Sequence, residues 1–210
     1  MSAKHAYVFA YDISDPKRAR GIRKAITRWR IDGQYSVHET QLGQRDYEAV
    51  CAEMIELSDA QTDRALAAKL NSHKRSIYHL HHQPRRRSIL GPAHRPAPQR
   101  WQDGCYLLSY DVRDRRRLQR VQRKIKSAVI PLQRSVFLFS GKGQALDTIC
   151  EHVAAILDLA EDDCRVYHLR SPSDILFLQG PSPLGVLEKP QRVSPLKQML
   201  LSSLLRRQRE

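Results

Sequence analysis

Two short apolar runs, AYVFAYDISD (6–15) and CYLLSYDVRD (105–114), stand 99 residues apart and both contain Tyr-Asp followed by a second aspartate. In each run, aromatic, aliphatic and β-branched side chains follow one another with few polar breaks. This pattern is typical of a central strand that is covered on both faces. We therefore predict strands from Tyr7 to Ile13 and from Tyr106 to Val112.

A helix is predicted directly after each strand. Asp15-Pro16 combines a capping carboxylate with a proline at the first helical position, and Asp114 can cap the second helix in the same way. Apolar residues then recur at helical spacing, which indicates one face turned to a core. These residues are Ala19, Ile22, Ile26 and Trp29 in the first copy, matched by Leu118, Val121, Ile125 and Ala128 in the second.

The remaining elements complete the order strand, helix, two strands, helix, strand. In the first copy we expect a second strand over 34–40, a second helix over 47–57 and further strands over 76–81 and near 91. In the second copy we expect them over 133–139, 147–159, 165–169 and 175–178, with a hairpin turn at 140–143. The third strand is poorly marked in both. This βαββαβ order predicts the α+β, ferredoxin-like fold in two tandem copies, packed as a pseudo-twofold dimer.

The boundaries of the copies follow from their alignment. Residues 7–38 match 106–137 without a gap at the offset of 99, and ten of the 32 positions are identical. Further on, Tyr78-His79-Leu80 matches Tyr167-His168-Leu169 at an offset of 89, so we expect a loss of ten residues from the second copy. Four parts are predicted. They are a first domain at 1–92, a Pro- and Arg-rich linker at 93–105, a second domain at 106–181 and a tail at 182–210.

The tail contains an amphipathic segment, SPLKQMLLSSLLRRQRE (194–210), that begins with the helix-start pair Ser194-Pro195. Its apolar stripe consists of Leu196, Met199, Leu200 and Leu204. We expect a C-terminal helix that docks on a protein partner, because a helix of this length is marginal alone. Packing of this helix on its own domain is the alternative.

Charge narrows the class of partner. The chain has 36 Lys and Arg against 22 Asp and Glu, a formal net charge of +14, so it should attract polyanions such as nucleic acid or an anionic membrane. No apolar run approaches the roughly 18 residues that span a bilayer, and the N-terminus MSAKHAYVF lacks the pattern of a signal peptide. We therefore expect a cytoplasmic protein that binds nucleic acid and no membrane.

The two predicted first helices carry an excess of basic residues. They contain Lys17, Arg18, Arg20, Arg23, Lys24, Arg115, Arg116, Arg117, Arg120, Arg123 and Lys124. A helix that only needed solubility would mix signs to gain pairs at i and i+4. We therefore predict a phosphate-binding face on each helix, with a plain charged surface as the alternative. Phosphate contacts read no bases, and no groove-reading motif is present.

Asp12 and Asp111 stand at the ends of the two predicted first strands, where a turn or capping role is one interpretation. Asp15 and Asp114 already fill the capping role, however. If the copies pack about a twofold axis, each brings one carboxylate, and two carboxylates ~4 Å apart repel by about 4 kcal/mol at an effective dielectric of 20. A divalent cation, Mg²⁺ or Mn²⁺, would relieve this repulsion, hold a phosphodiester and activate water.

These motifs together resemble a known family. YDISDPKR with QYSVHE, and YDVRDRRR with QRSVFLF, resemble the first strand, first helix and second strand of the CRISPR-associated protein 2 family, over residues 7–92 and 106–181. Its members are usually single domains that form homodimers, so this chain resembles a fused dimer. The resemblance implies that Asp12 and Asp111 match the metal-binding aspartates of the family, which has been assigned divalent-metal-dependent RNA and DNA cleavage. It also implies a dimer that joins two CRISPR integrase dimers.

Two function hypotheses remain. In the first, the chain bridges integrase dimers during spacer acquisition and holds double-stranded DNA, both the spacer precursor and the repeat array. In the second, it is a free-standing metal-dependent endonuclease or endoribonuclease, like the toxin ribonucleases that share the fold, with RNA as a candidate substrate. His38 stands where Phe137 stands, so the copies are not equivalent and enzymatic activity is left open. A double RNA-recognition module is disfavoured, because no strand carries its clustered aromatics.

Overall fold

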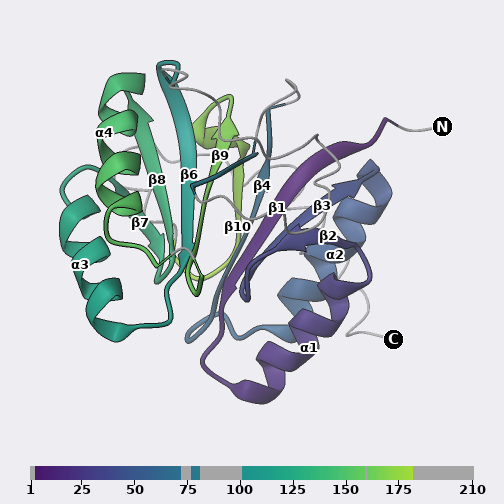
Figure 1. Cartoon of the computed structure of the whole chain (residues 1–210). Helices are drawn as coiled ribbons and strands as arrows, with labels where there is room; N and C mark the ends of the chain where they lie inside the picture. Colours follow the sequence, from purple (N-terminus) through teal and green to yellow (C-terminus); the bar gives the residue numbers. More distant parts are fainter. Residues whose placement is uncertain (1–2, 72–76, 81–100, 159, 182–210) are drawn as a thin grey trace, which may run out of the picture.

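The computed structural model describes residues 3–71, 77–80, 101–158 and 160–181, and its two halves have the same order of elements (Figure 1). The first half contains β1 (His5–Asp12), α1 (Pro16–Thr27), β2 (Arg30–Gly33), β3 (Val37–Leu42), α2 (Gln44–Leu57), β4 (Arg64–Lys69) and β5 (Ile77–His79). The second half contains β6 (Gly104–Asp111), α3 (Arg115–Ile125), β7 (Ile130–Gln133), β8 (Val136–Gly141), α4 (Gly143–Ala154), β9 (Asp163–Leu169), a 3-10 turn (Pro172–Asp174) and β10 (Ile175–Gln179). The predicted βαββαβ order is confirmed twice, and one further strand follows it in each half.

The last strand of each half belongs to the sheet of the other half. The first sheet has the strand order β10-β4-β1-β3-β2, and the second has the order β5-β9-β6-β8-β7. β10 pairs antiparallel with β4, with Ile175 opposite Ala68, and β5 pairs antiparallel with β9, with Ile77 opposite Tyr167. Backbone hydrogen bonds therefore cross between the halves at two equivalent places, as a pseudo-twofold dimer requires.

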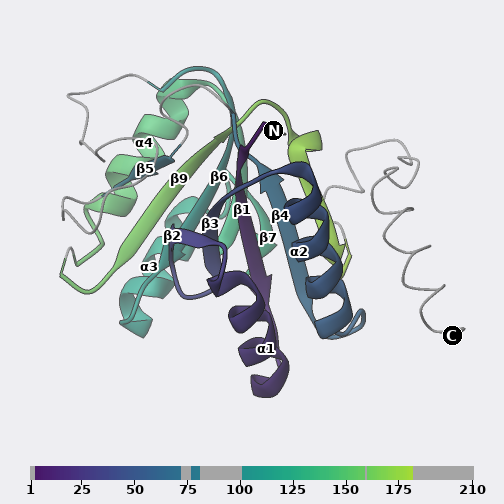
Figure 2. The ribbon, with the colours of Figure 1, turned by 90° about the vertical axis from the view of Figure 1, so that its right-hand side faces the viewer.

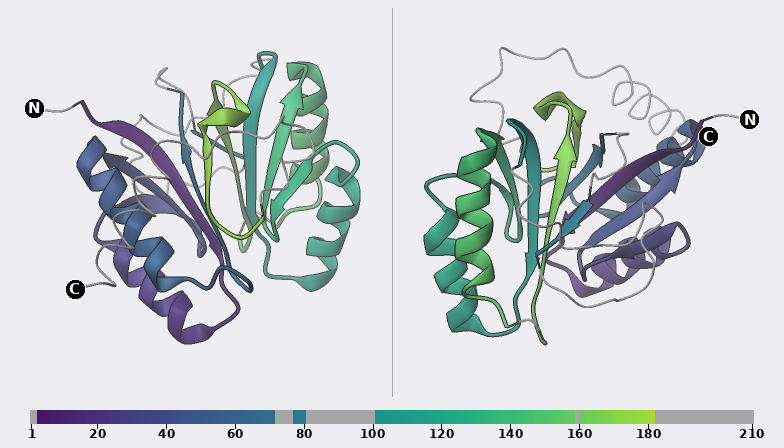
Figure 3. Two further views of the ribbon diagram at one scale, coloured as in Figure 1. Left: turned by 180° about the vertical axis from the view of Figure 1, so that it is seen from behind. Right: turned by 45° about the horizontal axis from the view of Figure 1, so that its top comes forward.

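The molecule is built from four layers, with two sheets inside and a pair of helices on each outer side (Figures 1 and 2). α1 and α2 cover the first sheet, and α3 and α4 cover the second, as the view from behind also shows (Figure 3). An apolar cluster lies between each sheet and its helices. A third cluster lies between the sheets and includes Val8 and Leu66 of the first half and Leu107 and Leu138 of the second. We call this third cluster the central layer.

Two buried glutamines at equivalent positions join the halves. Gln34 donates a hydrogen bond from Nε2 to the backbone oxygen of Asp163, at 3.1 Å. Gln133 donates one from Nε2 to the backbone oxygen of Ala10, at 3.2 Å. Both side chains are buried, so these bonds are shielded from water. The repeated Gln-x-Ser-Val motif therefore serves the contact between the halves.

The fourth strand of the first half corrects the sequence prediction. β4 lies at Arg64–Lys69, which matches the start of β9 at the same offset of 99, and both strands pair with the first strand of their half. The segment predicted over 76–81 contains β5, which joins the second sheet instead. The match at an offset of 89, and the loss of ten residues inferred from it, are therefore wrong. The strand predicted over 175–178 is present as β10, but in the first sheet.

The predicted second strands, over 34–40 and 133–139, are also corrected, because a hairpin turn lies near the start of each segment. In the first half β2 ends at Gly33 and β3 begins at Val37. Gly33 has a φ of 137°, and a Cβ there would lie 2.1 Å from the backbone oxygen of Val37, so this turn requires glycine. The turn predicted at 140–143 lies instead where β8 ends and α4 begins.

The helix starts are as the sequence indicates. The Asp15 carboxylate accepts hydrogen bonds from the N–H groups of Lys17 (2.9 Å) and Arg18 (2.8 Å). Asp114 accepts one from the N–H of Arg117 at 2.7 Å. Each carboxylate thereby satisfies free amides at a helix N-terminus, which confirms the predicted caps.

Several predicted features lie outside the described residues. These are the strand near residue 91, residues 93–100 of the linker, and the tail from 182 onwards with its helix and its stripe of Leu196, Met199, Leu200 and Leu204. Within the part of the chain that the structure describes, no helix is long and apolar enough to cross a membrane.

Candidate nucleic-acid interface and metal site

The two candidate aspartates and the two basic helices share one end of the molecule. β1 and β6 both run toward the lower edge in Figure 1, where they lead into α1 and α3. Asp12 is the last residue of β1, and Asp111 is the last residue of β6. The fold therefore brings both strand ends and both helix N-termini to the same edge of the paired sheets.

An arginine of α1 holds the helix against a buried carboxylate. Arg18 donates from Nε to Asp63 Oδ2 at 2.7 Å, and the side chain of Asp63 is fully buried. The N–H groups of Ser14 (3.2 Å) and Asp59 (2.9 Å) also donate to this carboxylate. Burial alone would raise the pKa of Asp63, but the hydrogen bonds from Arg18, Asp59 and Ser14 outweigh it and hold the pKa well below its usual range.

The second half repeats this contact. Arg117 donates from Nε to Asp162 Oδ2 at 2.8 Å, and the N–H groups of Arg113 (3.0 Å) and Asp158 (2.9 Å) donate to the same carboxylate. Burial of Asp162 is again outweighed by these hydrogen bonds, so its pKa is lowered. Asp63 and Asp162 did not enter the candidate set, although they keep the offset of 99.

Arg18 and Arg117 therefore hold α1 and α3 in place through their ion pairs. The other predicted basic residues are the candidates for contacts with phosphate. Arg23 is half-buried, and its guanidinium carbon lies 3.7 Å from the ring centre of Tyr35. The rest are exposed to solvent. They are Lys17, Arg20, Lys24, Arg115, Arg116, Arg120, Arg123 and Lys124. The predicted phosphate-binding faces thus present eight exposed cations and no acid within the two helices.

A polar cluster in the first half has no counterpart of the same chemistry in the second. The hydroxyl of Tyr11 lies 3.3 Å from His38 Nε2 and donates to the backbone oxygen of Tyr35 at 3.3 Å. Arg23 donates from Nε to the Tyr11 hydroxyl at 3.4 Å. Burial, reinforced by nearby arginines, lowers the pKa of His38 to about 4, so this imidazole is neutral at neutral pH. Phe137 occupies the equivalent position.

Asp12 and Asp111 have different neighbours. In the sheet ladder Asp12 lies opposite Arg64, whereas Asp111 lies opposite Asp163. Residues directly opposite in an antiparallel ladder share one face, so the first half places an acid opposite a base and the second places an acid opposite an acid, the acid–acid pair of Asp111 and Asp163. Partial desolvation, followed by the charge of Asp163, raises the pKa of Asp111. The positive charge of Arg113 opposes this shift, and Arg165 pairs with Asp163 at 2.9 Å.

The acid–acid pair fits a hard divalent cation. Asp163 Oδ2 is paired with the guanidinium of Arg165 at 2.9 Å, so only Oδ1, which is buried and accepts no hydrogen bond, is left as a ligand beside Asp111. Among the described residues no group of three or more His, Cys, Asp or Glu side chains is arranged to hold a metal. Mg²⁺ commonly binds proteins through one or two carboxylates and keeps several waters, so two carboxylates meet its needs. When bound, the ion would supply a Lewis acid for phosphate oxygens.

The class of this protein is a fused dimer of a small ferredoxin-like domain. Its two halves exchange their end strands, and each has a basic first helix and an aspartate at the end of its first strand. A family model described as CRISPR associated protein Cas2 matches residues 5–76 and 105–174. The two matches together cover more than half of the chain. The chain therefore belongs to the Cas2 family, with one family unit in each half.

Individual relatives match a stretch about as long as one half. CRISPR-associated endoribonuclease Cas2 1 of Nitrosomonas europaea is 39% identical over 64 residues, which are 30% of this chain and 61% of the relative. CRISPR-associated endoribonuclease Cas2 of Allochromatium vinosum is 36% identical over 74 residues, 35% of this chain and 78% of the relative. A relative of the same kind from Rhodospirillum rubrum is 38% identical over 69 residues, 33% of this chain and 68% of the relative.

Proposed function

We propose that this chain is the nucleic-acid-binding subunit of the CRISPR adaptation complex, where it bridges integrase dimers and holds incoming duplex DNA by phosphate contacts. The observation that carries this proposal is the set of exposed basic side chains along α1 and α3, two helices that begin at the same edge of the paired sheets (Figure 1). The nearby acids Asp63 and Asp162 are buried and already neutralised by arginine. Such a surface attracts a polyanion and releases its counterions on binding.

The joined halves suit a bridging role. Exchange of β5 and β10 fixes the two halves relative to each other, so the chain presents two related surfaces at a constant spacing. A pseudo-twofold arrangement of this kind can engage two copies of one partner in equivalent ways. One chain would then supply the surface that two separate single-domain subunits otherwise form.

Charge reversal on the helices tests the DNA contact. Lys17→Glu combined with Arg116→Glu changes equivalent, exposed positions in the first turns of α1 and α3. Glutamate is favourable near a helix N-terminus, so the fold should be retained. The matched control is Arg45→Glu with Lys142→Glu, which makes the same change in net charge at the starts of α2 and α4.

Duplex affinity should fall at least tenfold in the helix variant, and the slope of log K against log salt should become shallower by about 2, because each phosphate contact contributes about 1. The loss should be the same for unrelated DNA sequences. Fluorescence anisotropy over a salt series measures both quantities. An equal loss in the control variant would show that net charge alone, and no defined surface, attracts the DNA.

A second candidate function is metal-dependent cleavage, either within the complex or as a free-standing endonuclease. The names of the relatives, which are endoribonucleases, favour it. Asp12 and Asp111 would be the catalytic and metal-binding residues, with Mg²⁺ or Mn²⁺ as cofactor and RNA or DNA as substrate. The neighbours of each aspartate favour Asp111 as the stronger metal ligand, since the Oδ1 atom of Asp163, which Arg165 does not engage, adds a second carboxylate oxygen there, whereas Arg64 opposite Asp12 repels a cation.

Single and double replacements test this candidate. Asp111→Asn should weaken Mn²⁺ binding, measured by titration calorimetry, more than Asp12→Asn does. The double variant should lose any Mg²⁺- or Mn²⁺-dependent cleavage of RNA or DNA while its duplex affinity is unchanged or slightly higher, because negative charge near phosphate is removed. Undiminished cleavage by the double variant would place the chemistry at other residues.

A further inference from the structure

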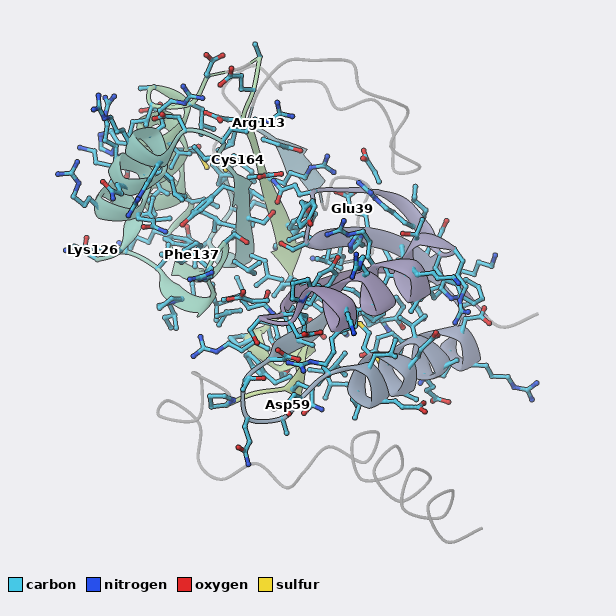
Figure 4. All side chains as sticks on the ribbon, turned by 90° about the horizontal axis from the view of Figure 1, so that it is seen from below. Glu39, Asp59, Arg113, Lys126, Phe137 and Cys164 are labelled. Carbon is cyan, nitrogen blue, oxygen red and sulfur yellow. The ribbon has the colours of Figure 1, made fainter. Side chains whose placement is uncertain are left out.

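The contact between the two sheets contains an ion pair on one side of the pseudo-twofold axis. Arg165 of β9 reaches from the second half to Glu39 of β3 in the first, with Nη1 2.6 Å from Oε1. The two side chains are only 6% and 5% exposed. Tyr167 donates its hydroxyl to the same carboxylate at 3.1 Å. In Figure 4, Glu39 lies where the elements of the two halves meet.

Both halves share in satisfying the Arg165 guanidinium. Within the second half, Asp163 accepts from it at 2.9 Å. From the first half, the carboxylate of Asp32 lies 3.5 Å away, and the backbone oxygen of Gly33 accepts at 3.4 Å. Burial raises the pKa of Glu39, and the positive charge of Arg165 opposes this effect. Glu39 is therefore satisfied by two groups of the second half, Arg165 and Tyr167, whereas Arg165 draws its partners from both halves.

The equivalent positions on the other side of the axis are apolar. At the offset of 99, Leu66 corresponds to Arg165, Leu138 to Glu39, Ala68 to Tyr167 and Pro131 to Asp32. Leu66, Leu138 and Ala68 are all buried in the central layer. The same contact is thus ionic where the first half supplies β3 and the second β9, and apolar where the roles are reversed.

We infer that this asymmetry makes the interface specific for unlike halves, so that a first half pairs with a second half and is prevented from pairing with another first half. About a twofold axis every contact occurs twice. Two first halves would set each Glu39 against Leu66 and Ala68, which leaves two buried carboxylates without a cation. Removal of one partner from a buried pair is strongly destabilising, and such penalties give specificity against the wrong partner.

Pairing of two second halves is excluded for the matching reason. Each Arg165 would keep Asp163 of its own half but would face Leu138, which offers no acceptor in place of Glu39, and each Tyr167 would occupy a place that Ala68 fills in the structure. Charge and volume are then both mismatched. The correct occupant of each interface is therefore the other half of a chain of this kind, and two chains have no stable way to associate through like halves.

Cutting the linker tests this inference without changing any described residue. A protease site is inserted within residues 93–100, and the folded chain is cut there. The two fragments are then unfolded in urea and returned to buffer, so that each half can pair with either kind of half. Native mass spectrometry then separates first–first, first–second and second–second pairs by mass. Nearly all dimers should be first–second pairs. A random mixture of the three pairs, in proportions of about 1:2:1, would overturn the inference.

Substitution of the ion pair supplies a second test. Glu39→Leu with Arg165→Leu makes this side resemble the apolar side, so like pairs should rise at least tenfold in the cut sample. The control, Leu66→Met with Leu138→Met, conserves volume on the apolar side and should leave like pairs rare. In the uncut chain, which needs no refolding, sedimentation should show concentration-dependent chain dimers for the leucine variant only. If the leucine variant pairs as selectively as the natural chain in both assays, the ion pair is not the source of specificity.

Discussion

The first half places His38 beneath Tyr11, and the second half places Phe137 beneath Tyr110. The ring centres are 5.6 Å apart in the first pair and 5.2 Å in the second, and both pairs are stacked. In both halves the tyrosine hydroxyl donates to a backbone oxygen of the hairpin turn, at Tyr35 or at its counterpart, with the same distance of 3.3 Å. The packing is thus shared, while only the first half has an imidazole in place of a phenyl ring at this position. The two copies therefore keep the same ring packing at this position but differ in the polarity of the ring.

The residues that are repeated and those that differ have different tasks. The arginine–aspartate contacts that hold α1 and α3, and the glutamines that join the halves, occur in both copies. Where one half faces the other, some equivalent buried positions carry unlike residues, as at Glu39 and Leu138. In a homodimer one substitution changes both sides of the axis, whereas in a fused chain each side can change alone. Fusion therefore permits an interface with two unlike sides.

The largest effect is expected from breaking the ionic side. Arg165→Leu leaves Glu39 buried without its cation, so the free energy of unfolding should fall by about 3 to 5 kcal/mol, measured in urea. Adding Glu39→Leu should restore most of it. Leu66→Met, at the equivalent position on the apolar side, should lower it by less than about 1.5 kcal/mol. Equal losses for Arg165→Leu and Leu66→Met would mean that the two sides do not differ in energy.

The histidine should give the first half a pH dependence that the second lacks. The unfolded chain binds a proton at His38 with a pKa near 6.5, whereas the folded chain binds it only near pH 4. Between these values the unfolded state binds more protons, so stability falls as the pH is lowered from about 6.5 to 4, by about 3 kcal/mol in total. His38→Phe copies the second half and should remove this slope from urea unfolding curves recorded at a series of pH values.

Phe137→Leu provides the control for His38→Phe, because it changes the equivalent position without touching a titratable group. It should lower stability by a similar amount at every pH. If His38→Phe leaves the slope between pH 4 and 6.5 unchanged, the acid sensitivity of the fold originates in other groups.

The repeated arginine–aspartate contacts should behave alike in the two halves. Asp63→Asn or Asp162→Asn removes a carboxylate that accepts charged and backbone hydrogen bonds, so each should lower stability by about 2 kcal/mol at pH 7. The pKa values of both groups are lowered in the folded state. Their contribution is therefore present above the unfolded pKa of about 4 and is lost as the pH falls below it. Thermal unfolding of both variants at pH 7 and pH 3 compares the two halves. A large difference in stability loss between Asp63→Asn and Asp162→Asn would be attributed to Glu161, which also pairs with Arg117, at 2.8 Å.

The smallest effect is expected at Tyr35, which is 65% exposed. Tyr35→Ala removes the stacking of Arg23 on the ring, an interaction worth about 0.5 to 1 kcal/mol at an exposed site. Arg134→Ala at the equivalent position has no such stack to lose and should change stability by less than about 0.5 kcal/mol. Chemical unfolding measures the loss of stability in each variant. If Arg134→Ala lowers stability as much as Tyr35→Ala does, both losses arise from the change in the hairpin turn and the stacking of Arg23 contributes nothing.

The tandem fold could be predicted because its signals are local and occur twice, as strand runs, caps and helical spacing. β4 could not, since its sequence RALAAK contains three alanines, which favour helices and are weak in strands. It becomes a strand because it pairs with β1 on one side and β10 on the other. The exchange of the last strands is equally invisible to local patterns, which do not specify which sheet edge a strand joins.

The candidate site shows the same division. Asp12, Asp111 and the basic helices could be found from the sequence, because their residue types and positions along each element are local properties. The residues that contact these and other charged side chains could not be found in this way. Asp63 is 45 residues from Arg18, and Glu39 is 126 residues from Arg165, and only the folded chain brings them together. Exact repetition at the offset of 99 was the one available signal for Asp63 and Asp162.

The exchanged strands impose an order of events on synthesis. The edge of β4 is covered by β10, and Ala68 precedes its partner Ile175 by 107 residues. At roughly 5 to 20 residues per second, a ribosome exposes that edge for about 5 to 20 s before its partner emerges. An uncovered edge is a template for pairing with a neighbouring nascent chain. Arg64 and Lys69, the charged ends of β4, are placed to discourage such pairing during this interval.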